Sequence, residues 1–113
     1  MRPAVDMQHL ARYTGGDEAL NAEVFTLFEN QATELVGRLT TVLETRDAKA
    51  WMEITHTLKG AARGIGAFGF GDAAAAAEPI DLVRDSASAA LAIQTLTASS
   101  AEVQTFIRAY LKR

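Results

Sequence analysis

The chain has 113 residues, of which 49% are hydrophobic and 22% charged, a composition typical of one globular domain. It contains no cysteine, which excludes disulfides, thiolate metal sites and cysteine nucleophiles. Eleven Lys and Arg stand against fourteen Asp and Glu, and the net charge of −3 leaves no basic stripe for nucleic acid. We therefore expect a single domain over residues 1–113 that binds no nucleic acid.

The hydropathy pattern gives no sign of a membrane segment. No stretch approaches the ~18 consecutive apolar residues of a membrane helix. The first residues also lack the apolar core of a signal peptide. We expect a cytoplasmic protein, and because no feature demands a dimer, a monomer.

The first half of the chain has a helical pattern. A short helix is expected between Val5 and Tyr13, closed by glycines at positions 15 and 16. Asp17 is a suitable N-cap for a long helix, in which apolar residues recur at spacings of three, four and seven. Its expected buried stripe comprises Leu20, Val24, Leu27, Phe28, Leu35, Leu39, Val42 and Leu43.

Three more helices are expected in the second half. Asp47 can cap one over about residues 48–66, and another covers about residues 70–83. Pro79 removes a hydrogen bond and clashes in a helix interior, so a kink or break is expected near residues 75–79. Ser86 or Ser88 can cap the last helix. Short loops make neighbouring helices antiparallel, which predicts an all-α, up-down-up-down four-helix bundle with a short extra N-terminal helix.

The helix at about 48–66 carries an unusual polar face. With Leu58 at the centre of its buried stripe, His56 lies roughly 160° away. Lys59, Gly60 and Arg63 follow on the same outward side. An imidazole is a competent nucleophile near neutral pH, the two cations can offset a phosphoryl group, and the glycine leaves room for another protein. The pattern suits a phosphate that is received and handed on.

The motif around this histidine resembles that of a known family. His56, Leu58, Lys59 and Gly60, with Gly66-Ala67 ten and eleven residues after the histidine, resemble the signature of histidine-containing phosphotransfer (HPt) domains. Such domains are phosphorelay intermediates of two-component signalling. The resemblance implies a four-helix bundle with the histidine exposed on its second long helix. This sequence departs from the family at Ala62, where a small polar residue is usual, and in the alanine run at residues 73–77 with Pro79.

The resemblance implies a role for each residue of the motif. His56 would accept a phosphoryl group from a receiver-domain aspartyl phosphate and pass it to another receiver. Lys59 would lie near the phosphoryl group and Gly60 would give steric access. The partners would be the receiver domains of a hybrid histidine kinase and of a response regulator, bound transiently. The chain would need no cofactor of its own, and Mg²⁺ is expected on the partner receiver.

Four further residues are candidates for binding near His56. Gln31 on the preceding helix could approach the imidazole, as a polar residue does in the family. Arg63 could contact the phosphoryl group or be only a solvated charge, and Gly64 could ease packing. Met52 is either core filler or part of an apolar docking patch, since methionine suits adaptable partner surfaces. The other histidine, His9, is expected to be an ordinary surface residue.

Other functions have weaker support. The sequence has no P-loop, so we expect a phosphoryl carrier without an ATP site rather than an enzyme. A helical adaptor that binds a kinase or response regulator without transfer is the alternative. Glu53 and His56 form one Glu-x-x-His unit, whereas di-iron bundles use two with inward histidines, so no metal site is expected.

Overall fold

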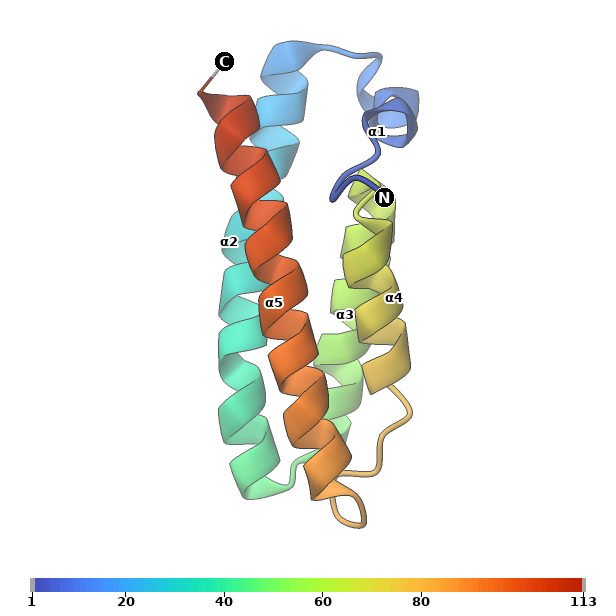
Figure 1. Cartoon of the computed structure of the whole chain (residues 1–113), viewed down its shortest axis with the longest axis vertical. Coiled ribbons are helices and arrows are strands. Elements are labelled where there is room, and N and C mark those ends of the chain that lie inside the picture. The colour runs from blue at the N-terminus through green and yellow to red at the C-terminus, as the bar shows by residue number, and fades with distance from the viewer. Residues whose placement is uncertain (1, 113) are drawn as a thin grey trace.

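The computed structural model describes residues 2–112; Met1 and Arg113, the ends of the expected domain, lie outside the described residues. Its helices, in chain order, are α1 (Met7–Thr14), α2 (Glu18–Thr45), α3 (Ala48–Ile65), α4 (Phe68–Ala77) and α5 (Ser86–Leu111). The last four alternate in direction along the long axis of the molecule, and α1 lies at one end (Figure 1). The expected all-α bundle with a short N-terminal helix is therefore confirmed. None of the helices within residues 2–112 is long and apolar enough to cross a membrane.

Aspartate carboxylates cap four of these helices. They accept hydrogen bonds from backbone N–H groups of the first turns of α1, α2, α3 and α5, and the residues are Asp6, Asp17, Asp47 and Asp85. The predicted caps Asp17 and Asp47 are confirmed. The prediction of Ser86 or Ser88 for the last helix is wrong, because the Asp85 carboxylate accepts from the Ser88 N–H at 3.1 Å. Ser86 is already the first helical residue.

The proline shortens α4. The break expected near residues 75–79 is confirmed, since α4 ends at Ala77. The expected continuation to residue 83 is wrong. Pro79 has no N–H for the helical ladder and its ring clashes with the preceding turn, so residues 78–85 leave the helix and Val83 is exposed.

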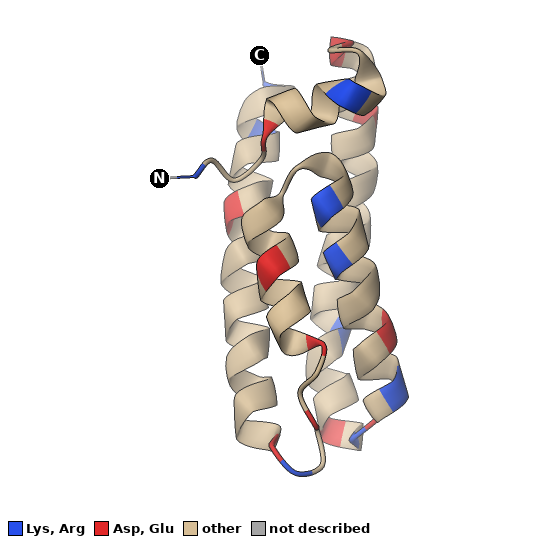
Figure 2. Cartoon of the chain, turned by 90° about the vertical axis from the view of Figure 1, so that its right-hand side faces the viewer, with Lys and Arg blue, Asp and Glu red and all other residues tan. Residues whose placement is uncertain are grey.

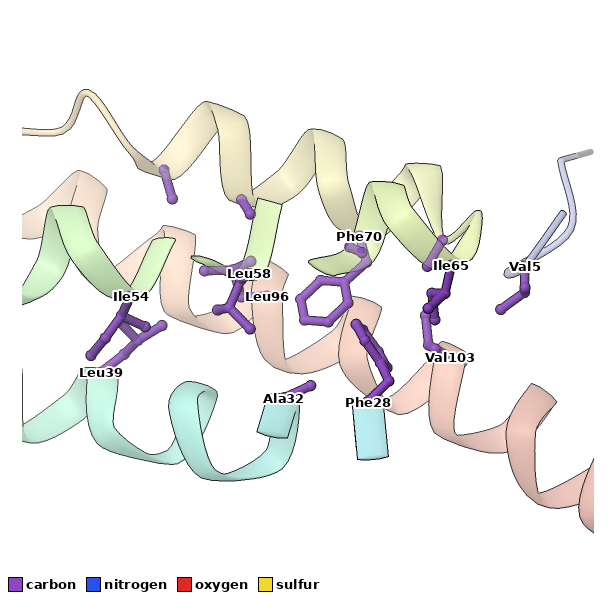
Figure 3. Packing of buried hydrophobic residues seen from close by; sticks show 14 of the residues in the cluster. Val5, Phe28, Ala32, Leu39, Ile54, Leu58, Ile65, Phe70, Leu96 and Val103 are labelled. Carbon is purple, nitrogen blue, oxygen red and sulfur yellow. The ribbon is translucent and has the colours of Figure 1, made fainter. Parts of the chain in front are cut away.

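The core lies between α2, α3, α4 and α5, and Figure 3 shows how Leu58, Phe70 and Leu96 meet there. The prediction of a buried α2 stripe fails at Leu20 and Leu27, which are 39% and 70% exposed. Phe25 is fully buried instead, and its ring lies edge-on to the Phe106 and Tyr110 rings of α5. The buried face of α2 is turned toward α5 because aromatic rings bury more apolar area there.

The N-terminal segment packs on the turn between α3 and α4. The Asp6 N–H donates to the Gly66 carbonyl at 2.9 Å, and a Cβ at Gly66 would lie 2.6 Å from the Asp6 carbonyl oxygen. Gly66 also has a φ of 88°, which L-residues rarely adopt. The glycine therefore ends α3 and permits the close approach of the N-terminal segment.

Candidate functional site

His56 lies on the outward face of α3, as its helical spacing predicted. Its side chain is 67% exposed, whereas Thr55 and Leu58 on the same helix are buried. Thr55 satisfies its hydroxyl internally by donating to the Trp51 carbonyl at 2.8 Å. The buried neighbours fix the rotation of α3 about its axis, and this rotation presents the imidazole to solvent.

A carboxylate that the sequence analysis did not single out joins His56 to Lys59. Oε1 of Glu78 lies 2.9 Å from Nδ1 of His56, and Oε2 accepts a hydrogen bond from Nζ of Lys59 at 2.8 Å. The Lys59 ammonium first, and the His56 hydrogen bond second, hold the pKa of Glu78 below its ordinary value. Figure 2 shows this side of the bundle, where basic positions on α3 lie beside acidic positions on α4 and after it.

Glu78 is fixed by the way α4 ends. Its own N–H donates to the Ala74 carbonyl at 3.0 Å, so the last turn of α4 orients it. The buried Trp51 indole N–H donates to the Ala77 carbonyl at 2.9 Å and so ties this end of α4 to α3. Pro79 then turns the chain away. The Glu78 side chain is 23% exposed, less than that of His56, so the Glu78 side of the network is partly covered by the protein.

The two glycines next to His56 leave open surface. A Cβ at Gly60 or Gly64 would meet no atom within 4 Å, so internal packing does not require either glycine. A Cβ at Gly71 of α4, in contrast, would lie 2.9 Å from Cγ of Arg63. The side chain of Arg63 therefore lies across α4 beside Gly71, on the same side of α3 as Lys59.

Gln31 and Met52 are not part of the hydrogen-bond network of His56, Glu78 and Lys59. Gln31 lines a shallow apolar hollow of about 460 Å³ between α2 and α3, together with Val24, Leu27, Phe28, Ala61 and Ile65. This is the other side of α3 from Glu78, and within residues 2–112 the polar contact of the imidazole is with Glu78 rather than with Gln31. Met52, one turn before His56, is 53% exposed and so is not core filler.

His9 has a different environment. Its ring lies edge-on to those of Tyr13 and Phe68, with centroids 5.5 and 5.0 Å away, and it is partly buried rather than an ordinary surface residue. In the part of the chain that the structure describes, no three His, Asp or Glu side chains form a group able to hold a metal ion.

The fold and site together define a helical bundle that presents one histidine to solvent, with a carboxylate on Nδ1 and a lysine beside it. The model of the family described as Hpt domain matches residues 23–108 of this chain. The chain therefore belongs to the Hpt domain family, whose members are phosphotransfer modules of two-component systems that bind receiver domains transiently. Searches of curated proteins and of solved structures found no significant match.

Glu78 could have been found from the sequence by counting around the turn. His56 lies ten residues before Gly66 and Glu78 twelve after it. Two antiparallel helices joined at that turn bring positions at similar distances from it side by side. The acidic residue before Pro79 was the available signal, but it belongs to no local motif.

Proposed function

We propose that His56 accepts a phosphoryl group from an aspartyl phosphate on one receiver domain and passes it to another. The observation that carries this proposal is that the two nitrogens of the His56 ring have different environments. Nδ1 is hydrogen-bonded to Glu78, while Nε2 belongs to an exposed ring. A carboxylate only accepts hydrogen bonds, which assigns the proton of the neutral imidazole to Nδ1 and the lone pair to Nε2. Nε2 is then the nucleophile.

Positive charge near the ring supports the proposed role of Lys59. Its Nζ and the imidazole Nδ1 bond to the two oxygens of one carboxylate, so the ammonium lies close to the ring. A small movement would let Lys59 pair with an oxygen of the phosphoryl group, a charge-assisted interaction. Arg63, two turns after His56, adds a second cation on the same side. It would contact the phosphoryl group or the receiver.

The open surface around His56 supports docking of a receiver. Gly60 and Gly64 let another backbone approach α3 closely, and Met52 and Leu27 offer exposed apolar area. Gln31 lies in the adjoining apolar hollow, where it would contact the receiver rather than the imidazole. A small apolar surface without an enclosing pocket suits a transient complex. The receiver would supply Mg²⁺ and most of the catalytic groups, and this chain the nucleophile, as a carrier without its own ATP site.

A transfer assay tests this proposal. Receiver domains phosphorylated with radiolabel on aspartate are mixed with the wild type, with His56→Gln and with His9→Gln as the matched control. We expect acid-labile, alkali-stable label on the wild type and on His9→Gln, and none on His56→Gln. All three proteins should have the same helical circular dichroism. A folded wild type that binds a receiver without acquiring label would instead support the adaptor function.

A further inference from the structure

One face of the bundle lies away from His56. Figure 1 shows α2 and α5 on one side of the molecule and α3 and α4 on the other. Between α2 and α5 lies a shallow hollow of about 310 Å³, and within residues 2–112 all the residues that line it are uncharged. Residues 86–101 of α5 also include no charged residue, in a chain that is 22% charged (Figure 2). The α2–α5 face is therefore an uncharged surface.

Two residues of the hollow have no explanation within the bundle. Gly37 lies in the interior of α2, where glycine is destabilising, and a Cβ there would meet no atom within 4 Å. Ser100 is 6% exposed, yet its hydroxyl has no hydrogen-bond partner among residues 2–112. The hydroxyls of Thr97 and Thr105 on the same helix donate to carbonyls four residues earlier. A buried hydroxyl without a partner points to a group from outside this chain.

The stripe of α5 beside the hollow is complementary to itself. Two antiparallel copies of α5 that cross at Thr97 bring together residues equally far before and after it in the sequence. Ile93 of one copy then meets Ala101 of the other, a large side chain against a small one. Gln94 meets Ser100, whose hydroxyl its amide can bond. All five residues lie within about 60° of Thr97 around the helix.

We propose that a second copy of this chain covers the hollow, through a two-fold contact of α5 with α5 centred on Thr97. Gly37 leaves room for the second copy on the α2 side. The uncharged stripe keeps the net charge of −3 on each copy out of the contact, and it offers no opposite charge to an acidic or basic partner. A monomer was expected because no sequence feature demands a dimer, and the hollow forms only when α2 and α5 lie side by side.

The size of the face suits a weak dimer. At about 1.5 Å per residue, the stretch of α5 from Ala90 to Gln104 is about 20 Å long. The molecule is 22 Å across, so the contact covers roughly 450 Å² of each copy, or about 900 Å² in total. This area is below the ~1,200 Å² at which stable specific interfaces begin, and it is typical of complexes that form and separate readily.

The proposed dimer leaves the phosphotransfer site open. His56 lies on α3, on the side of the bundle away from the contact, so both copies would present their imidazoles outward. One dimer could then bind two receiver domains at the same time. The dimer itself does not depend on the proposed function, because its contact includes no residue of that site.

Sedimentation equilibrium of wild type, Thr97→Arg and Thr95→Arg tests the proposal. Thr97→Arg places two like charges opposite each other on the two-fold axis. Thr95→Arg is the matched control, because Thr95 is also exposed, also donates to a carbonyl four residues earlier, and lies about 160° away around α5. Gly37→Arg is a second disrupting variant, at a position with open space where arginine is the better helix former. Circular dichroism checks that each variant is folded.

We expect a monomer–dimer equilibrium in wild type and Thr95→Arg with the same Kd, roughly 10–500 μM. Added salt should leave it unchanged or tighten it, since the contact has no ion pair and salt screens the net charges. Thr97→Arg should weaken the dimer at least about tenfold, and Gly37→Arg replaces it in this comparison if Thr97→Arg loses helicity. A wild type that is monomeric at about 1 mM would overturn the proposal, as would a dimer that the disrupting variant leaves intact.

A disulfide cross-link tests the register of the contact. The chain has no cysteine, so Thr97→Cys places a single thiol on the proposed axis. Helices packed about 8–10 Å apart bring facing Cα atoms within the range that a disulfide spans. Mild oxidation should link two copies of Thr97→Cys and leave Thr95→Cys largely unlinked. Equal cross-linking of the two variants would overturn the proposal.

Discussion

Gly66 joins the end of α3 to the N-terminal segment through its contact with Asp6. Replacement of this glycine by alanine should lower the free energy of unfolding for two reasons. The first is conformational, because a φ of 88° disfavours any residue with a Cβ by about 1–2 kcal/mol. The second is steric. The new Cβ would lie 2.6 Å from the Asp6 carbonyl oxygen, a backbone atom that no side-chain rotation can move. The N-terminal segment would have to shift and weaken the hydrogen bond from Asp6, at a further cost of about 1 kcal/mol or more.

Gly15 supplies the matched control. It ends α1 with a φ of 66°, but a Cβ there would meet no atom within 4 Å. Gly15→Ala should therefore cost about 1–2 kcal/mol, and Gly66→Ala about 2–4 kcal/mol. Urea unfolding followed by circular dichroism gives both free energies. Equal destabilisation by the two variants, within about 0.5 kcal/mol, would refute the role assigned to the Asp6–Gly66 contact.

Three further predictions concern the site and its support. Gly60→Gln should leave the free energy of unfolding unchanged or raise it by up to about 1 kcal/mol, because glutamine is the better helix former and its side chain would have open space. The same variant should slow phosphoryl transfer, because the larger side chain would block the receiver, and unimpaired transfer would contradict this. Trp51→Phe should lower the free energy of unfolding by about 1–3 kcal/mol, because it removes the hydrogen bond to the Ala77 carbonyl and leaves a smaller ring. Urea unfolding measures this difference, and no measurable change would show that the hydrogen bond contributes nothing. Contacts with Lys59 and then His56 lower the pKa of Glu78, so folding favours its ionised form. The stability advantage of wild type over Glu78→Gln should therefore be present at pH 7 and be lost as the pH falls below about 4.5. An advantage that persists undiminished well below this pH would contradict the ion pair.

The sequence predicted most of the fold because local signals agreed with one another. Asp17 and Asp47 marked helix starts, and Pro79 marked the end of α4. The rotation of α2 could not be predicted in the same way. This helix has apolar residues on more than one side, and the choice of Phe25 over Leu27 for the core depends on the α5 rings that pack there. Such a choice is made by tertiary packing and leaves no local pattern.

In the candidate site too, local features were predicted from the sequence and contacts between helices were not. The outward orientation of His56 followed from helical spacing, since Leu58 fixed which face is buried. Its polar contact with Glu78 did not follow, because Glu78 caps the end of a different helix and is brought to the imidazole only by the α3–α4 turn. Gln31 was expected to approach the imidazole from α2, but it lies in the hollow between α2 and α3, whereas the ring contacts Glu78 on the α4 side. A role of Gln31 in binding a receiver stays a prediction.

The assignment of Nε2 of His56 as the nucleophile is tested most directly by NMR of the phosphorylated protein with ¹⁵N in its histidine rings. After loading by a phosphorylated receiver, we expect one-bond coupling between phosphorus and Nε2 of His56, with the proton still on Nδ1 toward Glu78. The two nitrogens of His9 should be unchanged. Phosphorus on Nδ1 of His56, or on a residue other than His56, would contradict the assignment of Nε2 as the nucleophile.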